Sequence, residues 1–265
     1  MLRGSEAGAE WLRLLNRAKW PTTECLLARA GLQVGMHVLD VGCGSGEVTL
    51  RMAALVGAAG QVVEIDLDPA ILEAARRGTE DLSAPVSFRH LAVDELKDAG
   101  AYDFVFARYL LSHLPDPERA FAAMVRALRP GGRLAVEDVY FPGHICFPPS
   151  RAFQHYVDLY QAAVRAKGAD PTIGPRLMRM ALDAGLVGVE VGLVVPTFRG
   201  GDGKRVAQVT MEHIRGAVVG AGLATDAEVD ALVAALAAFA DDSRTLMSMA
   251  PTFQVWGRKA LSETT

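Results

Sequence analysis

A glycine-rich segment, VLDVGCGSG from Val38 to Gly46, constrains the fold of this chain more than any other feature. An apolar run that includes Asp40 leads into glycines with the spacing G-x-G-x-G. Glycine lets a backbone turn tightly and approach a ligand closely. Because the loop follows a predicted strand and precedes a predicted helix, it is typical of a nucleotide-binding turn in an α/β protein. A tight structural turn without a ligand is the alternative.

Strand-like and helix-like segments alternate after this loop. Short apolar runs predict strands, and apolar residues that share one face predict helices. This order predicts a Rossmann-like, doubly wound and mainly parallel α/β sheet, whose ligands bind beyond the carboxyl ends of the strands. The predicted strands are 37–41, 61–65, 86–90, 104–107 and 134–137, and the predicted helices are 47–56, 69–77 and 117–128.

The outer parts of the chain predict a lid and a cap. Residues 5–30 indicate two helices broken at Trp20-Pro21, and FPGHICFPPS is too rich in proline for a core strand. Helices are expected over 151–167, 175–184, 206–219 and after the capping box that begins at Thr225, with strands over 188–195 and 252–257. We therefore expect an N-terminal helical lid (1–30), a binding core (31–140), a helical substrate cap (141–185 and 199–248) and strands completing the core sheet (186–198 and 249–265).

The composition argues against several classes of function. The 265 residues carry a net charge of −4 and no dense stripe of Lys and Arg, which argues against a nucleic-acid partner. No apolar run approaches the roughly 20 residues of a membrane span, and no signal-peptide pattern is present. Three cysteines without C-x-x-C spacing suit a reduced cytoplasmic protein, and no cluster has metal-ligand spacing. We expect a cytoplasmic, metal-independent protein, with a homodimer as one possible assembly.

Two acidic residues indicate the charge of the ligand. Glu47 directly follows the last glycine, where a carboxylate would repel a phosphate but would tolerate a cationic group. Asp66 ends the second predicted strand about 20 residues after the loop, where a carboxylate can accept both ribose hydroxyls. Asp68 before Pro69 has the alternative role of capping the next helix.

These motifs together resemble the class I S-adenosylmethionine-dependent methyltransferases. The resemblance rests on VLDVGCGSG, VVEIDLDP, AYDFVFARYLLSHLPDP and LRPGGRLAVEDV, and TFQVWGRKA is similar to the last strand of that family. It implies a seven-stranded, mostly parallel sheet with an antiparallel C-terminal strand, and S-adenosyl-L-methionine as cofactor. KWPTTECLLARAGL and GHICFPP are similar to members with an extra cap, which implies a small-molecule substrate.

The resemblance assigns the glycine loop to the methionine end of the cofactor. Gly42, Gly44 and Gly46, with Cys43 between the first two, would pass beneath the methionine part. Asp40, at the end of the preceding strand, would organise this loop and orient the cofactor ammonium group.

The resemblance assigns the next two strand ends to the nucleoside. Asp66 would bind the ribose diol, and Leu67 would pack on adenine. The sequence departs from the family pattern with Ala92, where an acceptor for the adenine amino group usually stands. The Val93 amide can still donate to the ring, and either Asp94 or water would then supply the acceptor.

Methyl transfer depends mainly on alignment, and a base is needed only when the nucleophile carries a proton. His144, in the expected cap loop, can titrate near neutrality and is one candidate base; a loop histidine bonded to backbone is its alternative. His113 is the second candidate, with a structural role as its alternative. Arg108 would pair with the cofactor carboxylate or a substrate acid, or with a nearby acid such as Glu137 or Asp138.

Five aromatic or imidazole side chains are candidates for substrate contact: Trp20, Tyr109, Tyr140, His155 and Tyr156. The sequence thus predicts transfer of a methyl group to O, N or C of a small, partly apolar metabolite. An enzyme of this fold that binds the cofactor but catalyses cyclisation or elimination is an alternative, as is a non-catalytic partner. A nicotinamide-dependent oxidoreductase is disfavoured by the glycine spacing and by Glu47.

Overall fold

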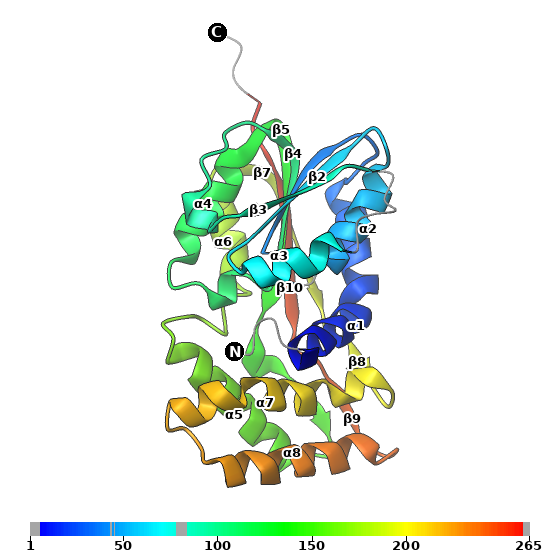
Figure 1. Cartoon of the computed structure of the whole chain (residues 1–265), viewed down its shortest axis with the longest axis vertical. Helices are drawn as coiled ribbons and strands as arrows, with labels where there is room; N and C mark the ends of the chain where they lie inside the picture. The colour runs from blue at the N-terminus through cyan, green and yellow to red at the C-terminus, as the bar shows by residue number, and fades with distance from the viewer. Residues whose placement is uncertain (1–5, 43, 45, 78–83, 262–265) are drawn as a thin grey trace.

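Seven strands form one sheet in the order β3-β2-β1-β4-β5-β10-β7 (Figure 1). The computed structural model describes residues 6–42, 44, 46–77 and 84–261, and only the backbone over 6–14. Strands β1 to β5 pair in parallel, and β10 runs antiparallel to both β5 and β7. The predicted mostly parallel sheet with an antiparallel C-terminal strand is confirmed. The strands are β1 (His37–Val41), β2 (Gln61–Asp66), β3 (Val86–His90), β4 (Tyr102–Arg108), β5 (Leu128–Val139), β7 (Leu186–Val194) and β10 (Thr252–Lys259).

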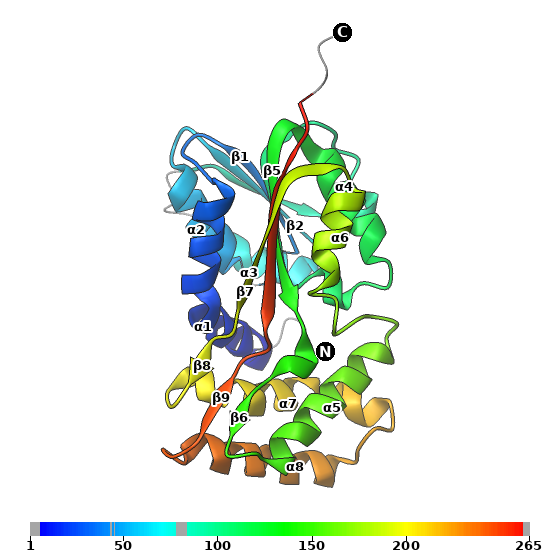
Figure 2. The same ribbon diagram turned by 180° about the vertical axis from the view of Figure 1, so that it is seen from behind.

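Helices bury both faces of this sheet, which explains the apolar residues that fill both faces of its central strands. Successive side chains of a strand point to opposite faces, so Val38 and Leu39 of β1 belong to different apolar clusters. Val38 packs in the cluster of α1 (Glu6–Ala30) and α2 (Glu47–Val56), and Leu39 in that of α4 (Pro117–Ala127) and α6 (Arg176–Asp183). Helix α3 (Pro69–Arg76) packs against β2 and β3. Figure 2 shows α4 and α6 on the face opposite α2.

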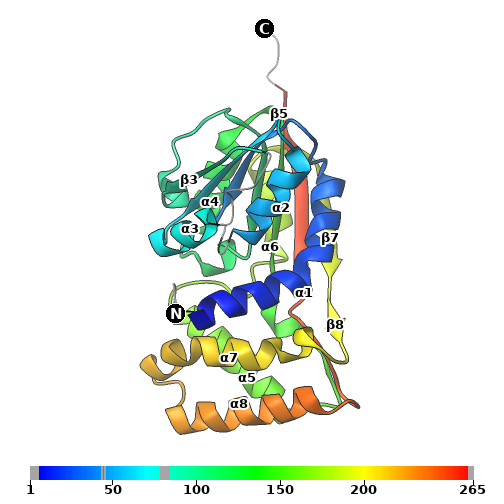
Figure 3. The ribbon, with the colours of Figure 1, turned by 45° about the vertical axis from the view of Figure 1, so that its right-hand side comes forward.

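The N-terminal region forms one helix, so the prediction of two helices is wrong. Helix α1 runs from Glu6 to Ala30 with Pro21 inside it. The ribbon bends midway, with its first part lying along α7 (Asp202–Gly220) and its second part beside the sheet (Figure 3). Proline removes one helical hydrogen bond and crowds the preceding turn, which kinks a helix without ending it where both halves are packed.

The cap consists of three helices around their own apolar cluster. Helices α5 (Arg151–Arg165), α7 and α8 (Asp226–Asp241) contribute Phe153, Met211 and Leu232 to this cluster. A small sheet of β6 (Cys146–Phe147), β9 (Leu246–Ser248) and β8 (Thr197–Phe198) lies beside them. Helix α6 instead buries Leu177 against the main sheet, so the cap does not extend to residue 185 as expected. Residues 197–198 pair in the small sheet rather than the core sheet.

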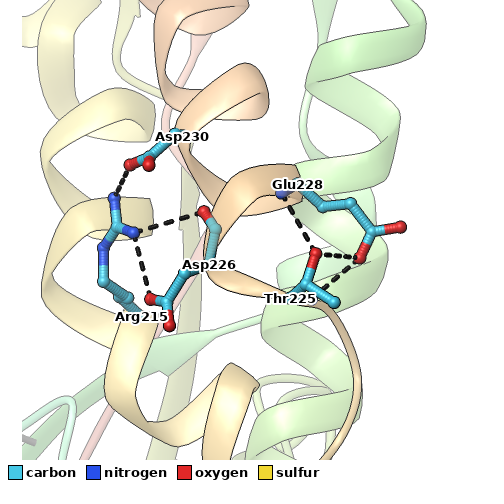
Figure 4. A network of polar contacts seen from close by, with 5 residues as sticks. All are labelled: Arg215, Thr225, Asp226, Glu228 and Asp230. Atoms are coloured by element: carbon cyan, nitrogen blue, oxygen red, sulfur yellow. Dashed lines mark hydrogen bonds and ion pairs between the residues drawn. The ribbon is translucent and has the colours of Figure 1, made fainter.

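A capping box begins α8, as the sequence predicts (Figure 4). Thr225 Oγ1 accepts a hydrogen bond from the Glu228 amide at 3.3 Å, and the Thr225 amide donates to Glu228 Oε2 at 2.8 Å. Arg215 of α7 donates to carboxylate oxygens of Asp226 and Asp230 and so ties α8 to its neighbour. These contacts fix where α8 starts and how it lies on α7.

Replacing Thr225 with Ala is expected to lower the free energy of unfolding by about 1 kcal/mol, the usual cost of losing a side-chain N-cap. Urea unfolding followed by circular dichroism measures the change. A Thr225→Ser variant keeps the hydroxyl group and should match the wild type. Equal losses in both variants would show that the methyl group, and not the cap, stabilises this end of α8.

Candidate active site

A cavity of about 1120 Å³ lies where the sheet meets the cap. Its sheet side is formed at the carboxyl ends of β1, β2 and β4 and by the segment after β3, the edge at which ligands of such sheets bind. Its cap side is formed by α5, α7 and the segment after β5. The cavity therefore joins the predicted cofactor region to the cap in one continuous space.

The glycine loop keeps the sheet side of the cavity open. Gly42, Gly44 and Gly46 have φ angles of 72°, 59° and 74°, in the left-handed region that glycine tolerates best. A Cβ on Gly42 would lie 2.9 Å from a methyl carbon of Leu110. A Cβ on Gly46 would lie 2.6 Å from that of Ala75, so Gly46 permits close packing of α3 and does not line the cavity. Gly42 and Gly44 do line it, whereas Cys43 lies outside the described residues.

Two carboxylates stand on either side of this loop, and both line the cavity. Asp66 Oδ2 accepts a hydrogen bond from the Gly44 amide at 3.3 Å, and Oδ1 accepts from the Asp68 amide at 2.9 Å. Asp40 is 2% exposed and accepts from Thr49 Oγ1 at 2.6 Å, and burial raises its pKa to about 6. Asp68 caps α3 through its own side chain, as expected, so the two acids have separate roles.

The remaining predicted nucleoside residues follow β2 and β3 along the cavity wall. Leu67 is 60% exposed, which leaves its side chain free to cover a planar ligand. Ala92, Val93 and Asp94 also line the cavity, the last two in the short helix η1 (Val93–Glu95). Asp94 lies 3.8 Å from Arg119, so its carboxylate is already paired at the surface.

A cluster of polar side chains lies at the carboxyl end of β4, where Arg108 is the last residue. The cluster comprises Asn16, Thr23, Arg108, Glu137 and Gln254. Arg108 donates to Thr23 Oγ1 at 3.3 Å and to Asn16 Oδ1. Glu137 accepts from Thr23 Oγ1 at 2.5 Å and from Gln254 Nε2 at 2.7 Å. Arg108 and Glu137 are therefore linked through the Thr23 hydroxyl group, and Arg108 also lines the cavity.

Helix α1 supplies cavity residues that the sequence reasoning missed. Leu15, Asn16 and Lys19 line the cavity, whereas Trp20 does not. The Trp20 ring instead lies under the Arg51 guanidinium, 4.4 Å from its carbon. The helical repeat could have indicated this difference. Residues three or four apart on a helix share a face, as Leu15 and Lys19 do, whereas the adjacent residues Lys19 and Trp20 do not.

The cap side is aromatic, and the structure separates the substrate candidates into two groups. Tyr109 and Tyr156 line the cavity. Tyr109 has φ of 52° and a hydroxyl 3.0 Å from Thr252 Oγ1. Tyr140 and His155 lie away from the cavity wall, since Tyr140 is 37% exposed and His155 is on the exposed side of α5.

Both candidate catalytic histidines line the cavity, in different settings. His113 ends the short helix η2 (Leu111–His113) and is half-buried. His144 Nδ1 lies 2.7 Å from the Phe141 carbonyl oxygen, and its ring packs edge-on against Phe141. Burial, with a contribution from the charge of Lys19, lowers the pKa of His144 to about 4. The expected titration of His144 near neutrality is therefore wrong.

The His144 ring is expected to stay neutral from pH 5.5 to 8, with Nδ1 protonated by its bond to Phe141. Because its pKa in the folded protein lies below the ordinary value, its contribution to stability is complete above about 6.5 and falls as the pH drops toward 4. Proton–nitrogen NMR of histidine-labelled protein measures this directly. A shift of the His144 resonances centred near pH 6.5 would contradict the expectation.

Across residues 6–42, 44, 46–77 and 84–261, no group of three or more His, Cys, Asp or Glu side chains is arranged to hold a metal ion. No helix within these same ranges is long and apolar enough to cross a membrane.

Comparison with known proteins identifies the core. Residues 38–132 match the family model described as a methyltransferase domain. The ubiquinone biosynthesis O-methyltransferase of Xanthomonas oryzae is 41% identical over 102 residues, 38% of this chain and 41% of that protein. An uncharacterised transposon protein of Streptomyces fradiae is 35% identical over 170 residues, 62% of this chain and 47% of that protein. The chain thus spans about half or less of the curated relatives it matches.

Solved structures share the fold over most of the chain. A Bacillus halodurans protein described as a methyltransferase candidate has a TM-score of 0.60 at 19% identity, over 89% of this chain and 98% of that one. The [4+2]-cyclase SpnF has a TM-score of 0.56 at 20% identity, over 91% and 81%. Haemonchus contortus phosphoethanolamine N-methyltransferase 2, solved with S-adenosylhomocysteine, has a TM-score of 0.56 at 20% identity, over 92% and 53%.

The sheet order and the cavity at the strand ends define a Rossmann-like methyltransferase fold. The domain built on residues 38–132 belongs to the class I S-adenosylmethionine-dependent methyltransferase family.

Proposed function

We propose that this chain is an enzyme that transfers a methyl group from S-adenosyl-L-methionine to a small molecule held under the cap. The observation that carries this is the single cavity of about 1120 Å³ that runs from the glycine loop to α5 and α7. Ligand pockets usually measure about 300–1,000 Å³, so this volume suits a cofactor and an acceptor side by side.

The residues on the sheet side fit the proposed cofactor. Gly42 and Gly44 line the cavity in the left-handed conformation and carry no side chain, which leaves room for a ligand against the backbone. Asp40 and Asp66 present two carboxylates and suit a ligand with an ammonium group, a sulfonium and a ribose diol. When bound, this cofactor supplies an electrophilic methyl group. Asp66 would accept hydrogen bonds from the ribose, and Leu67 would cover adenine.

The cap residues support a small, partly apolar acceptor. Phe141, Tyr156 and Tyr160 form an aromatic wall, with the Phe141 and Tyr160 rings stacked at 3.7 Å between centroids. Aromatic walls of this kind bury flat apolar groups, while a few polar atoms fix their orientation. Lys19 and Thr210 are polar residues that also line this cavity. The net charge of −4 agrees with a small molecule rather than a nucleic acid as acceptor.

Binding and turnover together test this proposal. Isothermal titration calorimetry should detect adenosylhomocysteine binding, and protein incubated with methyl-labelled cofactor and candidate acceptors should release labelled product. Absence of cofactor binding would sink the enzyme proposal and revive a non-catalytic role. Tight binding without methyl loss would favour a non-methylating reaction such as cyclisation. Binding of NADH in place of adenosylhomocysteine would favour an oxidoreductase.

A further inference from the structure

Lys19 is a buried amine on the wall of the cavity, at the junction of the sheet and the cap. It lies on α1 and is 2% exposed. Its Nζ donates to Thr252 Oγ1 at 2.8 Å and to the Ala250 carbonyl oxygen at 3.4 Å. These two acceptors match the two N–H groups of a neutral amine, so the nitrogen lone pair remains available on a residue that lines the cavity.

The groups around Lys19 do not neutralise an ammonium ion at this position. In the part of the chain that the structure describes, no carboxylate lies within ion-pair distance of its Nζ. Glu137 on β5 attracts a charge on Lys19, Arg108 on β4 repels it, and the Tyr109 ring lies 5.5 Å away. His144 faces it from the cap segment. Burial dominates these effects and lowers the pKa of Lys19 to about 7.

Resting on the proposed methyl transfer, we propose that Lys19 Nζ is the general base that accepts the proton of a phenolic hydroxyl group on the acceptor. The aromatic wall of Phe141, Tyr156 and Tyr160 suits the ring of such an acceptor, and Lys19 lines the same cavity. A general base works best when its own pKa lies near the working pH. Phenolic hydroxyl groups ionise near pH 10, within reach of such a base, whereas His144 is a much weaker base.

With Lys19 as the general base, each bond and each proton of the methyl transfer is accounted for. The phenolic oxygen forms a bond to the methyl carbon, the bond from that carbon to sulfur breaks, and the sulfur keeps the electron pair. The hydroxyl proton passes to Lys19 Nζ, which becomes an ammonium ion and later releases the proton to water. Thr252 and Ala250 hold Nζ in place throughout by accepting its other hydrogen bonds.

Lysine NMR tests the protonation state without any substrate. The chain has only five lysines, so protein labelled at lysine Cε gives a spectrum simple enough to assign by substitution. We expect one resonance to titrate near pH 7, to vanish in Lys19→Met and to persist in the control Lys97→Met, which changes an exposed lysine. Titration of the Lys19 resonance near pH 10 would overturn the proposal and leave the proposed function intact.

Turnover measurements distinguish a Lys19 that accepts a proton from a Lys19 that only supplies a positive charge. With phenol, catechol and 4-hydroxybenzoate as acceptors, Lys19→Met and Lys19→Arg should both lose about 100-fold or more in turnover at pH 8, because arginine keeps the charge but cannot accept a proton. Adenosylhomocysteine affinity should change less than threefold in both. Activity restored by arginine, a tenfold loss of cofactor affinity, or no methylation of any of these phenols by wild-type protein that binds adenosylhomocysteine would each overturn the assignment.

Discussion

Replacing Asp66 with Ala is expected to weaken adenosylhomocysteine binding by about 1.5–3 kcal/mol, which is roughly tenfold to more than a hundredfold in Kd. The carboxylate ends β2 on the cavity wall, 3.3 Å from the Gly44 amide. It therefore supports the glycine loop and, in the proposed complex, accepts hydrogen bonds from the ribose. Hydrogen bonds to a charged acceptor are stronger than neutral ones, so their loss should dominate the change in affinity. Isothermal titration calorimetry at fixed pH measures it.

Asp68 provides a matched control two residues along the chain. Its side chain accepts a hydrogen bond from the Ala70 amide at 3.0 Å and caps α3, and it does not line the cavity. Asp68→Ala should cost about 1 kcal/mol in stability while leaving the affinity for adenosylhomocysteine within about twofold. If both variants bind as the wild type does, Asp66 has no part in the site. If both lose affinity equally, the effect comes from the loop as a whole.

The core of the fold could be predicted because its signals are local. Both faces of β1 are buried, so its sequence is a short and mostly apolar run, and a glycine loop connects it to α2. The ends of strands were harder to predict. The predicted strand over 134–137 in fact begins at Leu128, before Pro130-Gly131, because β5 pairs with β4 across an irregular register. The continuity of α1 through Pro21 was hidden for a similar reason, since packing on α7 and the sheet holds both halves.

The two halves of the candidate site differed in how far the sequence could predict them. The cofactor side is built from segments that each follow a strand, so Asp40 and Asp66 are marked by their place in a motif. The cap side is built from helices far apart in the chain, where the facing direction decides which residue enters the cavity. His155 and Tyr156 are neighbours in sequence, yet only Tyr156 lines the cavity. Lys19 and Trp20 are also neighbours, and only Lys19 lines the cavity.

Replacing Glu137 with Leu is expected to lower the free energy of unfolding by about 3–5 kcal/mol, the scale of breaking a buried charged contact by removing one partner. Glu137 is 2% exposed and accepts hydrogen bonds from Thr23 and Gln254. Without it, the Thr23 hydroxyl group and the Gln254 amide each lose an acceptor, and Arg108 loses the carboxylate to which Thr23 links it. Urea unfolding at pH 7.5 measures the loss, with Glu118→Gln on the exposed side of α4 as a control that should change little.

A second variant separates the charge of Glu137 from its hydrogen bonds. Glu137→Gln keeps an acceptor for the Thr23 hydroxyl group and should cost less stability than Glu137→Leu. Both variants remove the charge that raises the pKa of Lys19, so in both the Lys19 resonance should titrate below pH 7. A rise of that pKa, or no change in either variant, would show that Glu137 does not act on Lys19 electrostatically. A fall in both would mean that the residue that stabilises this buried cluster also keeps the proposed base poised near neutrality.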